Sequence, residues 1–303
     1  MTSIPAHHTR PLDAASMVLV VLLCLVWGFN QPAIKLAIHD VPPLIQCAIR
    51  SSLAIPIVLV WMRWRGLPLL TRDGTLAPGL IAGMLFGLEF LLIYRGLLYT
   101  TASRAVLFIY LAPFFVVLGA RLVLPGDRFN VMQWIGLLLS FAGMAVAFGL
   151  PTPAADPRQL LGDVMMVAAA AIWAATTLMI KASALARVSP EKTLLYQLAV
   201  CVPIVAFGAL AFGERIAAMP SAVALGSLAY QTLVVGTTFS AWFALIVNFS
   251  ASRLSAFTFL TPIFGVAAGH LVLGELLTPA FALAVALVAA GLILVNRPHT
   301  SSP

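Results

Sequence analysis

A segment near the start of the chain recurs in its second half. Residues 25–35 (LVWGFNQPAIK) return as residues 171–181 (AIWAATTLMIK), with tryptophan and lysine both displaced by 146 positions (173 − 27 and 181 − 35). An Ala-Ser-Arg segment at 102–104 returns 149 positions later (253 − 104), and Gly143 is matched in the same way by Gly291. Because the matches keep their order, we expect two copies of one unit, residues 1–153 and residues 154–303.

The chain is too apolar to form a soluble domain. Hydrophobic residues make up 62% of the chain and charged residues 9%, whereas a soluble domain carries about 25% charged residues. Apolar stretches of roughly 20 residues, long enough for a helix to cross a bilayer, alternate with short polar breaks. We therefore predict an all-α integral membrane protein with ten transmembrane helices, near 16–37, 43–62, 76–98, 104–124, 130–150, 160–181, 192–212, 220–246, 251–273 and 279–295.

The odd number of helices in each copy determines how the two copies are oriented. A unit of five helices that begins on one side of the membrane ends on the other, so the second copy enters from the opposite side. Inverted repeats of this kind place a substrate site near the midplane and expose it alternately to the two sides. The sequence therefore predicts two inverted five-helix repeats around a central cavity, and it favours transport by alternating access.

The basic residues predict the orientation. If both termini are cytoplasmic, most of the 17 Lys and Arg residues lie on the cytoplasmic side, as the positive-inside rule requires. The orientation of the chain in the lipid membrane thus accounts for the net charge of +7, and no nucleic-acid partner is expected. Cys24, Cys47 and Cys201 fall singly in apolar stretches, which indicates neither a disulfide framework nor a metal site. We expect no metal, no cofactor and no obligate protein partner.

The repeated segments resemble the drug/metabolite transporter superfamily, in its ten-helix branch with two EamA-type repeats. The matching features are Trp27 and Trp173, the Gly162-Asp163 pair, the two Ala-Ser-Arg segments that each precede a proline, and Leu273-Gly274-Glu275. This resemblance, from about residue 16 to 297, implies a small-molecule transporter whose helices 1, 3, 4, 6, 8 and 9 surround the cavity. Its general similarity is to bacterial amino-acid exporters of the YddG type, which implies an inner-membrane location.

Polar and aromatic side chains share one face of the first predicted helix. Trp27, Asn30 and Gln31 follow helical spacing on a helix that is otherwise apolar. Pro32 beside them favours a bend, and a bend next to a polar stripe is suited to a gate. We expect Trp27 to face the cavity, while Asn30 and Gln31 either bind substrate or hydrogen-bond neighbouring helices.

An acid near the midpoint of the third predicted helix is the most costly residue of the chain to insert. A carboxylate at the membrane centre costs on the order of 3 kcal/mol, so Glu89 must face water or a basic partner. It is either a ligand for a substrate ammonium group or a coupling proton, or a structural partner of Arg50, Arg95 or Arg104. Its equivalent in the second copy is Thr238 (89 + 149), so the acid is not part of the duplicated scaffold.

Near Glu89 on the third helix, Phe86, Phe90 and Tyr94 recur every four residues, and they form either core packing or an apolar wall for a substrate side chain. Pro113 and Pro262 occupy matched positions in the fourth and ninth helices and are predicted hinges. The remaining candidate substrate-binding residues are Phe86, Phe90, Tyr94, Tyr110, Trp173, Thr177, Trp242 and Phe259.

These features predict a secondary transporter that exports small solutes, with aromatic or other neutral amino acids as the leading substrate class. The alternatives are a nucleotide sugar or phosphorylated sugar, which requires cations such as Lys35, Lys181 or Arg50 in the cavity, and an organic cation held by Glu89. An intramembrane enzyme is disfavoured, because no G-x-S-x-G motif, paired carboxylates or His/Asp metal set occurs at a workable spacing. No catalytic residue is therefore predicted.

Overall fold

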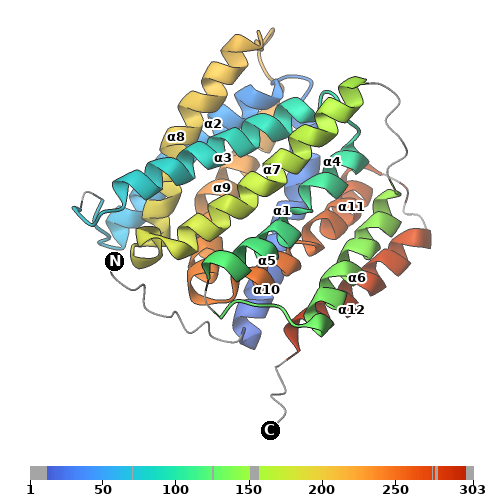
Figure 1. Ribbon diagram of the computed structural model, residues 1–303. Helices are drawn as coiled ribbons and strands as arrows, with labels where there is room; N and C mark the ends of the chain where they lie inside the picture. The colour runs from blue at the N-terminus through green and yellow to red at the C-terminus, as the bar shows by residue number, and fades with distance from the viewer. Residues whose placement is uncertain are drawn as a thin grey trace.

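The described residues of the protein form a bundle of packed helices (Figure 1). The structure, a computed structural model, describes residues 12–69, 71–124, 126–150, 157–274, 276 and 279–297, and for Gln31, Ala102 and Leu273 it describes the backbone alone. All ten predicted spans are confirmed as helical segments long and apolar enough to cross a membrane. The elements are α1 (Ala14–Ala37), α2 (Pro43–Trp64), α3 (Leu76–Gly96), α4 (Ala102–Ile109), α5 (Ala112–Val123), α6 (Val131–Phe148), α7 (Pro157–Ala182), the short 3-10 helix η1 (Ala184–Arg187), α8 (Pro190–Ala211), α9 (Ala222–Asn248), α10 (Ala251–Phe257), α11 (Leu260–Leu273) and α12 (Pro279–Asn296).

Two of the predicted spans are interrupted rather than merely bent. The fourth is divided into α4 and α5, and the ninth into α10 and α11. The cause is a proline just after each break, because a proline has no N–H and its ring collides with the carbonyl four residues earlier. For Pro113 that carbonyl belongs to Ile109, the last residue of α4, and for Pro262 it belongs to Thr258, the C-cap of α10. Pro32, in contrast, lies within a continuous α1.

Helix contacts come in equivalent pairs, as a duplicated chain requires. α1 packs against α9 and α11, and α7 packs in the same way against α3 and α5. α2 and α8 contact each other, and so do α6 and α12. The α2–α8 pair is antiparallel, because Glu214, just after α8, bonds to the start of α2, while Trp61 near the end of α2 bonds to Glu191 at the start of α8. Equivalent helices therefore run in opposite directions.

Helices α6 and α12 lie side by side at one edge of the molecule (Figure 1). A Cβ atom on Gly136 would lie 2.6 Å from the carbonyl oxygen of Gly291, and one on Gly143 would lie 2.8 Å from that of Ala284. The backbones approach so closely that only glycine fits at these positions.

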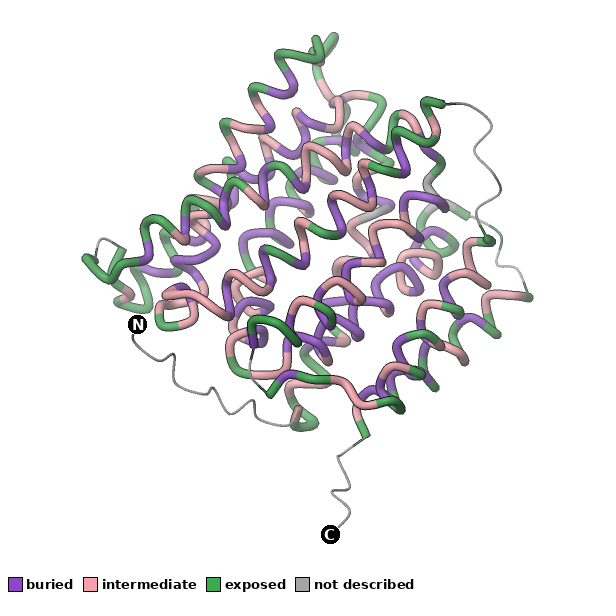
Figure 2. The backbone as a smooth tube through the Cα atoms, viewed as in Figure 1, coloured by how far each residue is buried: buried purple, intermediate pink, exposed green. Residues whose placement is uncertain are grey.

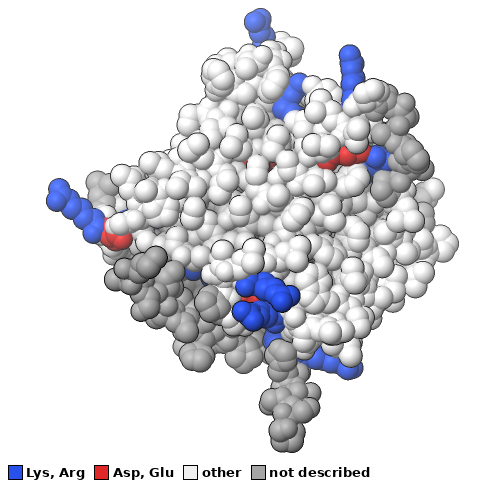
Figure 3. Space-filling view, viewed as in Figure 1, with Lys and Arg blue, Asp and Glu red and all other residues white. Residues whose placement is uncertain are grey.

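Apolar side chains cover the outside of the bundle. Buried residues follow the inward faces of the helices (Figure 2), while Leu122, Val131 and Leu210 are largely exposed. On the face seen in Figure 3, Lys and Arg side chains gather toward the helix ends and the band between them is nearly free of charge. This surface is suited to hydrocarbon, where backbone groups are satisfied within helices and apolar side chains meet lipid.

Candidate functional site

A cavity of about 240 Å³ lies between helices of both halves. Its wall comes from α1, α3, α4, α7, α9 and α11, together with Arg50 of α2 and Gln197 of α8. These six helices belong to the first, third, fourth, sixth, eighth and ninth predicted spans, which are the spans that the resemblance implied. Arg50 was considered as a partner of Glu89 or as a phosphate ligand, whereas Gln197 was not among the candidates. Ten of the twelve predicted substrate-binding residues line it: Trp27, Asn30, Phe86, Glu89, Phe90, Tyr94, Tyr110, Trp173, Thr177 and Trp242.

The other two candidates are not found on the wall. Phe259 is fully buried in the break between α10 and α11, and its ring packs behind the wall, 6.3 Å between centroids from Tyr110 and 6.5 Å from Phe114. The side chain of Gln31 lies outside the described residues. The three predicted hinge prolines do not line the cavity either, so any role they have is through the shape of α1, α5 and α11.

Aromatic rings form most of the apolar wall. The Trp27 ring centroid lies 5.4 Å from that of Trp242 and 5.6 Å from that of Phe239, in edge-to-face contact. Phe86 joins the same group, 4.8 Å from Phe90 and 6.0 Å from Phe239. Such rings offer a large apolar surface with defined geometry. Phe239 was missed by the sequence analysis, although the repeat contains the signal, because it is the counterpart of Phe90 (90 + 149).

One basic and one acidic side chain line this aromatic cavity. Arg50 is 3% exposed, and its guanidinium carbon lies 4.6 Å from the centroid of the Phe90 ring and 5.8 Å from that of Tyr94. Glu89 is 7% exposed. Among the described residues, no ion pair within 4.0 Å joins Glu89 to a Lys, Arg or His side chain.

The other two basic residues considered as partners of Glu89 are engaged elsewhere. Arg104 forms an ion pair with Asp163, which also accepts a hydrogen bond of 2.6 Å from the Thr100 hydroxyl. Arg95 stacks on the ring of Phe212, at 3.7 Å from its centroid. Among the described residues that line the cavity with Glu89, Arg50 is the one basic side chain.

Several polar atoms of the cavity have no hydrogen-bond partner among the described residues. They include both amide atoms of Gln197, Nε of Arg50, the hydroxyl of Tyr94 and Oδ1 of Asn30. Buried polar groups in folded proteins are normally paired, since an unpaired one costs about 1–3 kcal/mol. Unpaired donors and acceptors that converge on one cavity are suited to a ligand that is itself polar.

The two halves contribute different side chains at equivalent positions. Arg50 corresponds to Gln197 (50 + 147), and Glu89 corresponds to Thr238 (89 + 149). The Thr238 hydroxyl accepts a 2.8 Å hydrogen bond from the indole N–H of Trp27. Both cavity charges thus belong to the first half, and the second half presents neutral groups at the matching positions.

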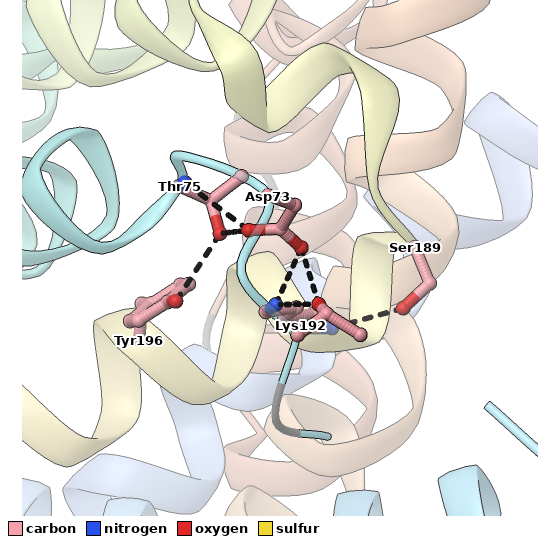
Figure 4. Close-up of polar contacts among 6 residues, drawn as sticks. Asp73, Thr75, Ser189, Lys192 and Tyr196 are labelled. Atoms are coloured by element: carbon pink, nitrogen blue, oxygen red, sulfur yellow. Dashed lines mark hydrogen bonds and ion pairs between the residues drawn. The ribbon is translucent and has the colours of Figure 1, made fainter. Parts of the chain in front are cut away.

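Polar contacts join the halves at the end of the bundle where α2 ends and α8 begins (Figure 4). The Asp73 carboxylate accepts hydrogen bonds from the ammonium group of Lys192, at 2.7 Å, and from the hydroxyls of Thr71 and Thr75. The Thr75 hydroxyl also lies 3.2 Å from that of Tyr196. These bonds hold the pKa of Asp73 well below its usual range. We call this group the Asp73 clamp.

A second set of contacts joins the halves at the opposite end. The Glu214 carboxylate accepts hydrogen bonds from the backbone N–H groups of Leu44 and Ile45, at 3.0 and 3.2 Å, and so caps α2. Asp40 accepts a 2.8 Å bond from the backbone N–H of Ser221, whose hydrogen bonding lowers the pKa of Asp40. We call these contacts the Glu214 clamp. The cavity therefore lies between two polar clamps.

Comparison with known proteins shows the family to which the chain belongs. The sequence profile of the EamA-like transporter family matches the chain twice, over residues 14–149 and 160–297. The chain belongs to the EamA-like transporter family. Each half of this EamA-family protein thus carries its own match, and the family confirms the resemblance, the ten-helix membrane fold and a transport function.

Several bacterial proteins are similar to this EamA-family chain along most of its length. It is 25% identical over 282 residues to "Uncharacterized transporter YoaV" of Bacillus subtilis, covering 91% of this chain and 94% of that protein. It is 27% identical over 290 residues to "Probable amino-acid metabolite efflux pump" of Escherichia coli, covering 91% and 93%. A crystal structure with 21% identity superposes with a TM-score of 0.79 over 94% of this chain and 98% of that one, which supports the fold.

Proposed function

We propose that this EamA-family protein exports neutral amino acids, including those with aromatic side chains, as a secondary transporter. The observation that carries the proposal is the presence of Arg50 and Glu89 in one small cavity whose wall is otherwise largely aromatic. A free amino acid carries a carboxylate, an ammonium group and a side chain, and the cavity has a complementary surface for each.

The chemistry of each group assigns its role. A guanidinium binds a carboxylate through two parallel hydrogen bonds, so Arg50 is the proposed ligand of the substrate carboxylate. Glu89 then binds the ammonium group, and Tyr94 and Gln197 supply further hydrogen bonds. Trp27, Phe86 and their neighbours contact the side chain. The cavity volume of about 240 Å³ is below the roughly 300–1,000 Å³ typical of pockets for drug-sized ligands, which favours a substrate the size of an amino acid.

Two other substrate classes fit the site less well. A phosphorylated sugar needs several cations, but Lys181 donates to the backbone carbonyl groups of Ile246 and Phe249, and neither Lys181 nor Lys35 lines the cavity. An organic cation would gain from Glu89 but would be repelled by Arg50. A zwitterion satisfies both charges at once.

Alternating access, the location and the direction are further parts of the proposal. The breaks before Pro113 and Pro262 act as hinges, with Pro32 shaping the gate, and the units 1–153 and 154–303 move relative to each other. The protein lies in the bacterial inner membrane with both termini in the cytoplasm. The printed name of the Escherichia coli relative, an efflux pump for amino-acid metabolites, supports outward transport.

Counterflow in proteoliposomes tests the substrate. Vesicles containing the full chain are preloaded with phenylalanine, and uptake of labelled phenylalanine is measured against competitors that lack one charge. Phenethylamine lacks the carboxylate and phenylpropionate lacks the ammonium group. We expect each competitor to inhibit uptake at least about tenfold less effectively than phenylalanine. This is the loss of affinity expected when a buried charged group is left without its partner. In cells, expression should raise the amount of amino acid released into the medium.

Two variants connect the competition to the residues. In Arg50→Gln, phenylalanine and phenethylamine should become nearly equal competitors, and in Glu89→Gln the same should hold for phenylalanine and phenylpropionate. Arg95→Gln, outside the cavity, should behave like the wild type. Folded protein that shows no counterflow with any amino acid would refute the assignment. Stronger competition by phenethylamine than by phenylalanine would indicate an organic-cation transporter instead.

A further inference from the structure

A second, larger cavity lies outside the central one, between α2 and α9. This groove has a volume of about 930 Å³ and shares no lining residue with the central cavity. The two open on different faces of α9, because Phe239 and Trp242 line the central cavity whereas Ser240 and Ala241 line the groove. A molecule in the groove would therefore occupy a site separate from the proposed substrate.

Between its two ends the groove is lined mostly by apolar side chains, and at one end α2 and α9 approach closely. A Cβ atom on Gly236 would lie 3.2 Å from the side chain of Ile57, so α2 and α9 are in close contact there. From Ile57 the groove follows α2 for eight residues to Arg65, about 12 Å at 1.5 Å per residue. Along this path Val60 is exposed, and the hydroxyl of Ser240 is buried without a hydrogen-bond partner among the described residues.

The other end of the groove is polar and carries one basic and one acidic side chain. Arg65 and Glu191 line it together with Trp61 and Trp64. The Arg65 guanidinium carbon lies 5.7 Å from the centroid of the Trp61 ring, and the indole N–H of Trp61 donates a 3.2 Å bond to Oε1 of Glu191. Trp61 thus lies between a cation and an anion that both line the groove, of which Arg65 is exposed and Glu191 is 9% exposed. Exposed tryptophans at a helix end are typical of the membrane–water interface.

We propose that this groove binds a phospholipid with a phosphoethanolamine headgroup. One acyl chain lies between α2 and α9 as far as Ile57, the phosphate meets Arg65, and the ammonium group meets Glu191. Charge complementarity selects this lipid: a phosphoglycerol headgroup has no ammonium group for Glu191, and a phosphocholine headgroup has no N–H donor. The Ser240 hydroxyl lies partway along the chain, where it can donate to an ester carbonyl.

Native mass spectrometry of the full chain tests the proposal. Delipidated protein is titrated with dioleoyl lipids that differ only in the headgroup, namely phosphoethanolamine, phosphocholine and phosphoglycerol. We expect the phosphoethanolamine lipid to bind best. Arg65→Gln and Glu191→Gln should each weaken its binding by about threefold or more, since about threefold is the size expected for a charge pair in contact with water. The matched control is Arg63→Gln, because Arg63 is exposed on the same turn of α2 but does not line the groove.

The possible results separate this lipid from the other occupants. Equal binding of all three lipids, unaffected by the variants, would mean that the groove holds an acyl chain but does not distinguish between lipid headgroups. That result would overturn the proposal. So would preferential binding of the phosphoglycerol lipid lost in Arg65→Gln alone, which would indicate simple anion attraction. Displacement of the bound lipid by amino acid would instead make the groove part of the transport path. Glu191→Gln keeps an acceptor for Trp61, so its fold should be preserved, which unchanged thermal unfolding would verify.

Discussion

The contact between α6 and α12 and the central cavity are both built from the two copies of the repeat, but they use the copies differently. At the α6–α12 contact, Gly136 meets Gly291 and Gly143 meets Ala284. Because Gly143 corresponds to Gly291 (143 + 148) and Gly136 to Ala284 (136 + 148), these are equivalent contacts. In the cavity, equivalent positions hold different groups, since Arg50 of the first copy corresponds to Gln197 of the second. The contact is symmetric, and the cavity is not.

This difference separates the requirements of packing from those of binding. Two helices that approach closely need small residues at each point of contact, and that need is the same in both copies. A substrate with one carboxylate and one ammonium group needs one cation and one anion. A cavity that repeated Arg50 and Glu89 in both halves would bury two more charges without ligands, at a high cost in desolvation. One charged half and one neutral half avoid that cost.

The largest effect should come from making the cavity symmetric. In Arg50→Gln both halves carry glutamine at the equivalent position, and the substrate carboxylate loses its cation. We expect the apparent KM for amino-acid counterflow to rise by about 10- to 100-fold, corresponding to the 1.5–3 kcal/mol of a hydrogen bond to a charged group. Thermal unfolding should change little, because Arg50 has no carboxylate partner within 4.0 Å among the described residues. An unchanged KM would contradict the proposed role of Arg50.

The symmetric contact should respond equally from either side. Gly143→Leu and Gly291→Leu each force a side chain against a facing backbone, and we expect each to lower the free energy of unfolding by about 1–3 kcal/mol. Gly226→Leu is the control, because a Cβ atom there has no other atom within 4 Å. Chemical denaturation of the purified protein measures all three. A clearly different cost for the two equivalent glycines would show that the contact is not symmetric in energy.

The paired tryptophans should differ in stability more modestly. Trp27→Phe removes the hydrogen bond to Thr238 and should cost about 0.6–1 kcal/mol beyond the change in packing. Trp173→Phe removes no indole hydrogen bond observed among the described residues and should cost less. Both variants are compared with the wild type by denaturation in the same detergent. If Trp173→Phe is the more destabilising, the hydrogen bond of Trp27 does not account for the difference between the halves.

The smallest effect is expected at the two clamps, from Asp73 of the Asp73 clamp and Asp40 of the Glu214 clamp, because neither acid is buried. Asp73 and Asp40 have lowered pKa values in the folded protein, so their ionised forms stabilise it above their unfolded pKa of about 3.9. That contribution is lost as the pH falls through the lowered pKa. The Tm difference between wild type and Asp73→Asn, and between wild type and Asp40→Asn, should therefore be constant from about pH 8 to pH 5 and shrink at lower pH. A difference that varied between pH 6 and 8 would point to another titrating group.

Many of the residues that line the central cavity were predictable, because their sequence signals are local or repeated. Trp27 and Trp173 are matched in sequence, Glu89 is costly at its depth, and Phe86, Phe90 and Tyr94 share a helix face with it, so all of them were candidates before the fold was known. The repeat also contained two signals that were not used. Phe239 is the counterpart of Phe90, and Gln197 is the counterpart of Arg50.

The rest depended on how the helices are rotated against one another. Arg50 was a possible partner for Glu89 or a phosphate ligand, and only packing against α3 places its guanidinium over Phe90 and on the cavity wall. Phe259 matches the cavity residue Tyr110 in sequence, yet it lies behind the wall, in the break before α11. A sequence match assigns a depth and a helix, but it does not assign the direction in which a side chain points.

The sequence by itself determined the ten spans, the duplication and the opposite orientation of the two copies. These follow from hydrophobic length and from an odd number of helices, which do not depend on how distant segments meet. The tertiary structure alone decided which polar groups share the cavity, which glycines face one another, and where the clamps and the groove lie. Each of these is a contact between segments far apart in the chain, and such contacts depend on the packing of whole helices rather than on any local pattern.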